Sequence, residues 1–242
     1  MDSQQNKIAY ITGTSRGIGR AIAELLLQEG YMVYGIGRTN EIQHHHFFPI
    51  NLDLSDLKAV EAFFFDAVGR EVILINNAGI IGEIGPIGVI ANHTIQSVMT
   101  VNALAPQMLI NKFIDTYRKQ DIIKGQIINI SSGAGKYPID GWANYCASKA
   151  AIDIYSETID LEFKLHQLHN WHIHSIAPGV VDTGMQSEIR SSNPELFKSH
   201  QKFIDLKADN ELNKPENVAT KLYEVIADPK RFDQTIISVR DF

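Results

Sequence analysis

The sequence predicts one doubly wound α/β domain, in which a seven-stranded parallel sheet is flanked by helices on both faces. Apolar runs that suit strands alternate with helical patterns along the whole chain, the order that gives parallel sheets with right-handed crossovers. Several of these runs are almost continuously apolar, as is typical of strands buried on both faces. No linker rich in Pro or Ser, internal repeat or change in composition divides the chain, so we expect residues 1–242 to form a single domain.

The expected strands and helices follow one another in a regular order. Strands are expected at short runs of apolar and β-branched residues, and helices where apolar residues recur every three or four positions. Gly30 is expected to end the first helix, since glycine is common just past a helix C-terminus. The expected strands cover 7–12, 31–36, 46–52, 71–77, 125–131, 171–178 and 235–239. The expected helices cover 18–28, 55–68, about 92–118, 144–166, about 185–207 and 215–227.

The composition excludes several classes of protein. The 22 Lys and Arg residues against 28 acidic ones give a net charge of −6 without any basic run, so nucleic acid is not an expected partner. The chain has no stretch of about 18 apolar residues, which excludes a membrane-spanning helix. Cys146 is the single cysteine, so no intramolecular disulfide can form and a reducing compartment is favoured. The opening residues MDSQQNK do not resemble a secretory signal, and we expect a cytoplasmic protein.

A glycine-rich turn joins the first strand to the first helix. In TGTSRGIG, over 12–19, Gly13, Gly17 and Gly19 let a pyrophosphate approach the backbone, and the helix N-terminus adds free N–H groups and positive potential. The spacing GxxxGxG differs from the more common GxGxxG, and a plain glycine turn is the alternative. GTSRG also matches the nucleophile elbow of hydrolases, but that elbow stands on a central strand rather than after the first one. The turn therefore favours a dinucleotide-binding (Rossmann) fold.

The end of the second strand indicates which dinucleotide is bound. An NAD site places a carboxylate there to hold the ribose diol, whereas this chain has Arg38, with Glu41 as the nearest acid. Arg16 projects from the glycine turn toward the same region. Two guanidinium groups can grip a 2′-phosphate through charge-assisted bonds, so NADP is favoured. Two solvated surface arginines are the alternative.

A tyrosine and a lysine lie one turn apart on one face of an expected helix. These are Tyr145 and Lys149, within YCASK. An adjacent ammonium stabilises a phenolate, so we expect Lys149 to draw the pKa of Tyr145 down from about 10 toward working pH. Such a phenol can donate a proton to a carbonyl oxygen or take one from an alcohol. Ser132, at the end of a strand, is placed to hydrogen-bond the reacting oxygen.

These features occur in the order and spacing of the short-chain dehydrogenase/reductase family, which the sequence resembles over nearly its whole length. The matching pieces are the turn over 12–19, NNAG over 76–79, Asn102, ISS over 130–132, Tyr145 with Lys149, and Pro178-Gly179 followed by Thr183. The resemblance implies that Tyr145 is the general acid/base and that Lys149 lowers its pKa and binds the nicotinamide ribose. It also implies that Ser132 orients the substrate carbonyl and that Asn102 holds a water linking Lys149 to solvent.

The resemblance further implies a set of cofactor contacts. Asp53 matches the acid that meets the adenine amino group, with a plain helix-entry loop as the alternative. Thr183 would lie near the nicotinamide carboxamide. The full set implied for the cofactor is Gly13, Ser15, Arg16, Gly17, Ile18, Gly19, Arg38, Asp53, Leu54, Asn77, Ala78, Gly79, Tyr145, Lys149, Pro178, Gly179, Val181 and Thr183.

Longer strings place the resemblance in one branch of the family. PGVVDTGMQ over 178–186, IRSS over 189–192 and FIDLK over 203–207 resemble the sepiapterin reductase and benzil reductase branch. Sepiapterin reductases place an aspartate near the C-terminus to anchor the pterin, whereas Ser238 stands there in this chain, with Asp241 shortly after. An aromatic diketone is therefore at least as suitable a substrate as a pterin.

The substrate side of Tyr145 is expected to be apolar and aromatic. Ser132, Trp142, Tyr145 and Met185 are the expected substrate contacts, with packing of Trp142 under a loop as the alternative. The segment over 184–207 is expected to be a lid that closes over the substrate. The three histidines over 44–46 lie in a connection without further ligands, so no metal site is expected.

The sequence thus predicts an NADPH-dependent carbonyl reductase that transfers hydride to a small ketone or diketone. A 3-oxoacyl-thioester reductase and a non-catalytic NADP-binding sensor of the same fold are the alternatives. The presence of both Tyr145 and Lys149 disfavours the sensor. The helix over 144–166 carries small and apolar residues suited to close packing. The family resemblance implies that this helix and the one near 92–118 pair across a two-fold axis, so we expect a homodimer, or a homotetramer built from two dimers.

Overall fold

The computed structural model describes residues 7–120, 122 and 124–242, and its centre is a parallel β-sheet. The seven strands lie in the order β3-β2-β1-β4-β5-β6-β7, and every neighbouring pair is parallel. The strand order reverses between β1 and β4, and the turns on either side of such a point leave a crevice at the carboxyl ends of the strands. The fold class predicted from the sequence is confirmed.

The strands lie close to where the sequence places them. They are β1 (Lys7–Thr12), β2 (Met32–Gly37), β3 (Phe47–Asn51), β4 (Glu71–Asn76), β5 (Lys124–Ile130), β6 (Trp171–Ala177) and β7 (Ile236–Ser238). Pro49 lies in β3, an edge strand. Proline is tolerated there because an edge strand has a neighbour on one side only.

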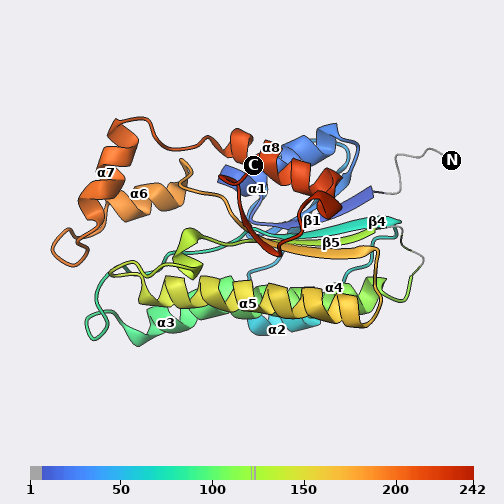
Figure 1. The fold of residues 1–242 in the computed structure, drawn as a ribbon, viewed down its shortest axis with the longest axis horizontal. Coiled ribbons are helices and arrows are strands. Elements are labelled where there is room, and N and C mark those ends of the chain that lie inside the picture. The colour runs from blue at the N-terminus through green and yellow to red at the C-terminus, as the bar shows by residue number, and fades with distance from the viewer. Residues whose placement is uncertain (1–6, 121, 123) are drawn as a thin grey trace.

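Two layers of helices cover the sheet (Figure 1). On one face lie α1 (Gly17–Gln28) and α8 (Pro215–Ala227), and on the other α2 (Leu57–Ala62), α4 (Ala105–Tyr117) and α5 (Ala143–Leu165). Side chains alternate along a strand, so each face of the sheet has its own core. Ile11 and Ile75 pack in the core beneath α1 and α8, whereas Tyr10 and Leu74 pack in the core beneath α4 and α5.

The helix expected over 55–68 is much shorter in the structure, and this prediction was wrong. After α2 the chain runs without regular structure, which lets Phe65 enter the core with its ring edge-to-face on Tyr10, at 4.8 Å between ring centroids. The Tyr10 hydroxyl accepts a hydrogen bond from the Ala67 N–H at 3.1 Å, and the Tyr117 hydroxyl donates to the Ala67 carbonyl at 2.8 Å. These contacts with distant residues satisfy the backbone and outweigh the local helical pattern.

The long helix expected over 92–118 is continuous but changes its pitch. α3 (Asn92–Met99) passes into a π-helical turn (Thr100–Leu104) and then into α4. Pro106, in the first turn of α4, has no N–H and cannot donate to the carbonyl four residues earlier. The sequence did not predict the wider turn, although π turns are common at functional sites.

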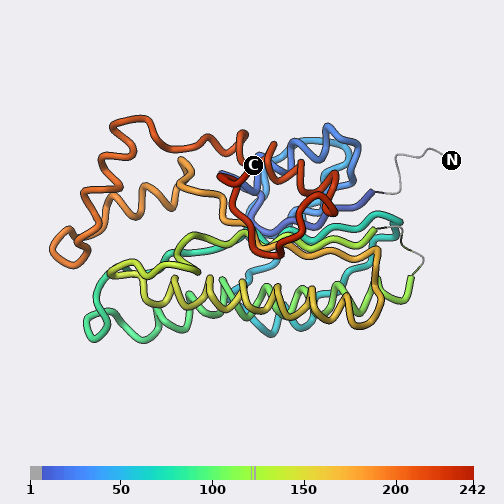
Figure 2. Tube along the Cα trace, in the orientation of Figure 1, coloured from blue at the N-terminus to red at the C-terminus, as the bar shows by residue number. Residues whose placement is uncertain are grey.

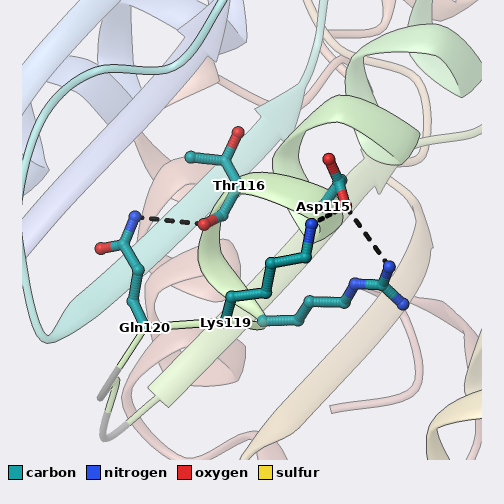
Figure 3. Close-up of polar contacts among 5 residues, drawn as sticks. Asp115, Thr116, Lys119 and Gln120 are labelled. Atoms are coloured by element: carbon teal, nitrogen blue, oxygen red, sulfur yellow. Dashed lines mark hydrogen bonds and ion pairs between the residues drawn. The ribbon is translucent and has the colours of Figure 1, made fainter.

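The C-terminal end of α4 is held by short-range polar contacts on the surface (Figure 3). Lys119 and Arg118 donate to the Asp115 carboxylate at 2.8 and 3.3 Å, and the Gln120 amide donates to the Thr116 carbonyl at 3.1 Å. The bond to Thr116 satisfies a carbonyl that the helix end leaves open. Exposed ion pairs such as those of Asp115 add little to the stability of the fold.

The helical segment expected over 185–207 is two helices rather than one. α6 (Gly184–Arg190) and α7 (His200–Ala208) are separated by an irregular stretch that contains Pro194. Proline lacks an N–H and disfavours a helical residue before it, which accounts for the break. Figure 2 shows that this part of the chain extends away from the sheet, whereas the C-terminal residues return to the centre of the fold.

No helix within the described ranges is both long enough and apolar enough to cross a membrane. The first six residues of the opening segment, on which the expectation about targeting rests, lie outside the described residues.

Candidate active site

A cleft of about 1260 Å³ opens at the carboxyl ends of the strands. Its walls come from the turns after β1, β2, β4, β5 and β6 and from α6 and α7. The residues expected from the sequence to meet cofactor or substrate all line it except Gly19 and Asn102, which are buried. The topology therefore gathers residues that are far apart in the chain at one place.

The glycine turn after β1 has the backbone shape that its sequence predicts. Gly13 and Gly17 have φ of +75° and +59°, in the left-handed region that favours glycine. Gly19 is required for a different reason, since a Cβ there would lie 2.2 Å from the carbonyl oxygen of Gly13. The absence of a side chain lets α1 begin directly against the turn.

The N-terminus of α1 is open to an anion. No side chain caps its first turn, and the first turn contains no acidic residue. The first N–H groups of a helix have no partner within the helix and carry positive potential. These groups face the same cleft as the glycine turn, because Gly17 and Ile18 line it.

Asn77 ties the turn after β4 to the glycine turn. Its side-chain amide donates to the carbonyls of Thr12 and Gly13 at 2.9 and 3.1 Å. In return, the Thr12 hydroxyl accepts from the backbone N–H groups of Asn77 and Ala78 at 2.9 and 3.0 Å. The sequence placed Asn77 among the cofactor contacts, and the structure adds that its amide holds the two turns together.

Arg16 crosses from the glycine turn to α6. Its guanidinium lies 3.8 Å from the carboxylate of Glu188, and a Cβ on Gly184 would lie 2.8 Å from the same guanidinium. Both partners of this ion pair are more than half exposed, so the pair contributes little stability.

Arg38 lies near Asp53 at the same end of the cleft. Asp53 Oδ1 accepts from the N–H and the hydroxyl of Ser55 at 2.9 and 2.8 Å. These two bonds, with a smaller contribution from the Arg38 charge, hold the pKa of Asp53 below its usual value. Asp53 therefore shapes its own loop and also lines the cleft, and its contact with the adenine amino group stays a prediction.

Tyr145 and Lys149 are buried together at the floor of the cleft. They are 6% and 5% exposed, and the Lys149 ammonium lies 5.6 Å from the centroid of the Tyr145 ring. Lys149 Nζ also donates to the carbonyl of Ile130 at 2.7 Å, which fixes it against the end of β5. Ser132 lies beside the phenol and accepts from the N–H of Ala134 at 3.2 Å.

The pKa of Tyr145 is raised, not lowered as the sequence predicted. Burial raises the pKa of Tyr145 to about 12, and the hydrogen bond with Ser132 opposes this rise. Burial also lowers the pKa of Lys149 to about 8, and the carboxylate of Asp153 opposes that change. The prediction was wrong because it counted the attraction between phenolate and ammonium and left out the desolvation of both groups.

Asn102 stands in the π-helical turn, behind the wall of the cleft. Its side-chain oxygen accepts from the N–H of Ile80 at 2.9 Å, and its amide donates to the Ile80 carbonyl at 2.8 Å and to the Ser148 hydroxyl at 3.2 Å. The main-chain carbonyl of Asn102 lacks its α-helical partner, because Pro106 has no N–H. The side chain thus serves the packing of this turn.

Aromatic side chains form the other wall of the cleft. Trp142 meets Tyr145 edge-on at 5.6 Å between ring centroids and stacks with Phe197 at 5.7 Å and with Phe203 at 5.2 Å. Met185 packs against the same cluster. Trp142 therefore packs under the segment between α6 and α7 and also borders the cleft, and its contact with substrate stays a prediction.

The sequence comparison identifies the family. The profile of the short chain dehydrogenase family matches residues 7–194. The chain belongs to this family. Benzil reductases ((S)-benzoin forming) from Bacillus cereus and Bacillus subtilis (strain 168) are 34% and 32% identical to it, over 91% of this chain and 94% and 93% of the relatives. Sepiapterin reductase from Xenopus tropicalis is 29% identical, over 78% of this chain and 80% of the relative. The branch predicted from the sequence is confirmed.

The cofactor class follows from the same comparison. The structure of 4-hydroxyisoleucine dehydrogenase complexed with NADH superposes with a TM-score of 0.78 at 26% identity, covering 96% of each chain. As a short-chain dehydrogenase, this chain is an oxidoreductase that acts on carbonyl or alcohol groups with a nicotinamide cofactor.

The sequence predicted a lid over 184–207 and pointed to Asp241 near the C-terminus, but it named no cleft contact in α7 or beyond β7. Phe203 and Leu206 of α7 line the cleft, as do Arg240 and Asp241 beyond β7. The position of Arg240 and Asp241 at the cleft could have been predicted, because the carboxyl end of β7 must lie at the same edge of the sheet as the carboxyl ends of its parallel neighbours. The position of α7 depends on its packing against Trp142, which no local pattern reveals.

Proposed function

We propose that this chain is an NADPH-dependent carbonyl reductase that reduces an aromatic ketone or diketone, with Tyr145 as the proton donor. One observation carries the proposal. Tyr145 is buried beside Lys149 at the point where the glycine-turn end of the cleft meets the aromatic wall. The identity to two benzil reductases supports a diketone as the substrate.

The residues at the glycine turn fit a dinucleotide. A turn with positive φ at Gly13 and Gly17 and an uncapped helix N-terminus is the arrangement that receives a pyrophosphate. Arg38 at the end of β2 and Arg16 in the turn supply positive charge where a 2′-phosphate is bound, which supports NADP over NAD. Arg16 would exchange its exposed ion pair with Glu188 for this phosphate.

The chain supplies the proton and the orientation for reduction. Bound NADPH would deliver a hydride to the carbonyl carbon. The Tyr145 hydroxyl donates its proton to the carbonyl oxygen, which completes the alcohol. The raised pKa of Tyr145 keeps the phenol in the neutral form that donates. The Lys149 ammonium, 5.6 Å from the centroid of the Tyr145 ring, would stabilise the phenolate left behind. The Ser132 hydroxyl, beside the phenol, orients the substrate oxygen.

Tyr145 must then recover a proton. The family resemblance implies a water held by Asn102 that links Lys149 to solvent. Both N–H groups of the Asn102 amide are already used by Ile80 and Ser148. The main-chain carbonyl of Asn102, which lacks its helical partner, is therefore the acceptor that we propose for this water.

We also propose that the protein is a homodimer that pairs through α5. Apolar side chains on this helix face outward, with Ile154, Leu161 and Leu165 60%, 55% and 69% exposed. Light scattering at micromolar concentration should give the mass of a dimer, and the double variant Ile154→Arg, Leu161→Arg should give a monomer. A monomeric wild type would refute this proposal. A homotetramer and a cytoplasmic location remain predictions.

A substrate panel tests the proposed activity. NADPH oxidation would be followed with benzil, sepiapterin and a 3-oxoacyl thioester under the same conditions. We expect benzil to react with the highest kcat/KM, because an apolar aromatic wall suits a flat diketone. Highest efficiency with the thioester would favour the alternative reductase. Tight NADPH binding without turnover of any carbonyl would favour the sensor.

A further inference from the structure

A buried carboxylate lies one helical turn beyond Lys149 and takes no part in the steps above. Asp153 is 7% exposed, belongs to the buried face of α5 that carries Tyr145 and Lys149, and borders the cleft. Carboxylates are rarely buried unless a partner compensates for the lost water. The partners of Asp153 therefore indicate what it does.

Three segments surround this carboxylate. From β6, the buried Ser175 hydroxyl donates to Asp153 Oδ1 at 2.6 Å. From the end of β5, the buried Ser131 faces the same carboxyl group. In the turn after β5, Gly135 leaves room for the second oxygen, since a Cβ there would lie 2.4 Å from Asp153 Oδ2. The carboxylate is fixed between α5 and the turn that leads away from β5.

Lys149 is the charged group that faces this carboxylate within the described part of the chain. The neighbouring strands present serine hydroxyls, and the turn over Gly133–Gly135 presents backbone, so neither adds charge. The carbonyl of Ile130, which accepts from Lys149, is neutral. Burial raises the pKa of Asp153 and lowers that of Lys149, and the charge of each group opposes the shift of the other.

We propose that Asp153 is a positioning residue, whose carboxylate keeps the Lys149 ammonium charged and directed toward Tyr145. This role rests on the proposed function, because it affects turnover only where Tyr145 donates the proton. Burial lowers the pKa of Lys149 and Asp153 raises it, so removal of the carboxylate should let Lys149 lose its proton at a lower pH. Reduction should then decline at a lower pH as well.

The variant Asp153→Asn tests this role, since it removes the charge and keeps an oxygen that can accept from Ser175. NMR of protein labelled with ¹³C at lysine Cε measures the pKa of Lys149 without turnover, once its signal is assigned by its loss in Lys149→Ala. We expect this pKa to fall by about one unit or more, because a nearby opposite charge shifts a pKa by roughly 1–3 units. The high-pH limb of kcat should move down by a similar amount, with the low-pH plateau retained.

Asp160→Asn is the matched control. Asp160 lies on the same helix, pairs with Lys164 at 2.6 Å and does not line the cleft. Its loss should change neither the pKa of Lys149 nor the pH profile.

Each other outcome decides the question. An unchanged Lys149 pKa in Asp153→Asn overturns the proposal, and so does a lowered pKa without a shifted limb in an active enzyme. If the wild type reduces no carbonyl, the proposed function fails, while the NMR titration still tests the charge of Lys149. Asp153→Ser is the second variant. If neither Asp153 variant folds while Asp160→Asn does, the carboxylate of Asp153 serves the stability of the fold alone, and the proposal is overturned.

Discussion

The two ends of the cleft are built in different ways. At the glycine-turn end, the shape comes from the backbone, through the positive φ of Gly13 and Gly17 and the bonds from Asn77 to two carbonyls. At the aromatic end, the shape comes from contacts between side chains that are far apart in the sequence, where Trp142 stacks with Phe197 and Phe203.

This difference separates cofactor binding from substrate choice. A site made of backbone N–H groups and tight turns recognises a phosphate through geometry that most side-chain substitutions nearby do not alter. A wall made of stacked rings changes shape with each ring that is replaced. A substitution at the glycine-turn end that removes a charge or a required glycine should therefore alter cofactor binding alone, and substitutions at the aromatic end should alter the KM for the carbonyl compound.

The largest effect is expected at Tyr145, where the two ends meet. Tyr145→Phe removes the proton donor and keeps the ring, so kcat should fall by at least about a hundredfold. NADPH affinity, measured by fluorescence titration, should stay near that of the wild type. Lys149→Ala should lower both turnover and NADPH affinity, because the ammonium is proposed to act on the phenol and on the ribose. A Tyr145→Phe enzyme that keeps more than about a hundredth of the wild-type rate would mean that another group is the acid.

The next largest effect is expected at Arg38, in the glycine-turn end alone. Loss of one charge-assisted contact costs about 1.5–3 kcal/mol, or roughly 10- to 150-fold in affinity. Arg38→Asp should therefore weaken NADPH binding by about this factor, move the preference toward NADH and leave the KM for the carbonyl compound nearly unchanged. Arg20→Asp, on the outer side of α1 where Arg20 pairs with Glu24 at 2.8 Å, makes the same charge change outside the cleft. Equal weakening by both variants would contradict a specific phosphate contact.

The same difference explains how far the sequence could predict the site. The turn over 12–19 forms within a few residues, so its motif and its geometry coincide. Within the expected lid over 184–207, Phe203 and Leu206 could not be singled out as cleft residues. Pro194 breaks the expected helix, and the position of α7 then depends on the stacking of Phe203 against Trp142. The raised pKa of Tyr145 was equally hidden, since spacing reveals a neighbouring charge but not the extent of burial.

The fold shows the same limit. The apolar pattern placed every strand of the sheet, because a buried strand must be apolar wherever the chain leads it. The helix expected over 55–68 failed after α2, where Phe65 and Ala67 find partners on Tyr10. Local helix propensity predicts structure poorly where residues can instead contact a distant side chain, as Phe65 and Ala67 contact the ring and hydroxyl of Tyr10.

The pH dependence of kcat should show an effect of intermediate size at Tyr145 and Lys149, where the two ends of the cleft meet. Reduction requires a neutral Tyr145 and a charged Lys149, whose pKa values are about 12 and about 8. As the pH rises, Lys149 is the first of the two to change, so kcat should decline above about pH 8 and approach a tenfold loss per pH unit. A pH–rate profile measures this. Lys149→Arg, which stays charged, should lack the decline in whatever activity it retains, and a wild-type profile that is flat to pH 10 would contradict the assignment.

The smallest effect is expected from Phe203→Leu, which changes the aromatic end alone. Aromatic pairs contribute about 0.5–1.5 kcal/mol beyond their buried area, so the KM for an aromatic diketone should rise by roughly 2- to 12-fold. NADPH affinity should not change, because Phe203 takes no part in the backbone that shapes the glycine turn. Phe163→Leu is the matched control, since Phe163 packs on Trp171 in the core beneath α5 and does not line the cleft. It should lower thermal stability and leave KM unchanged, and an equal rise in KM in both variants would show that loosened packing, rather than the aromatic wall, governs substrate binding.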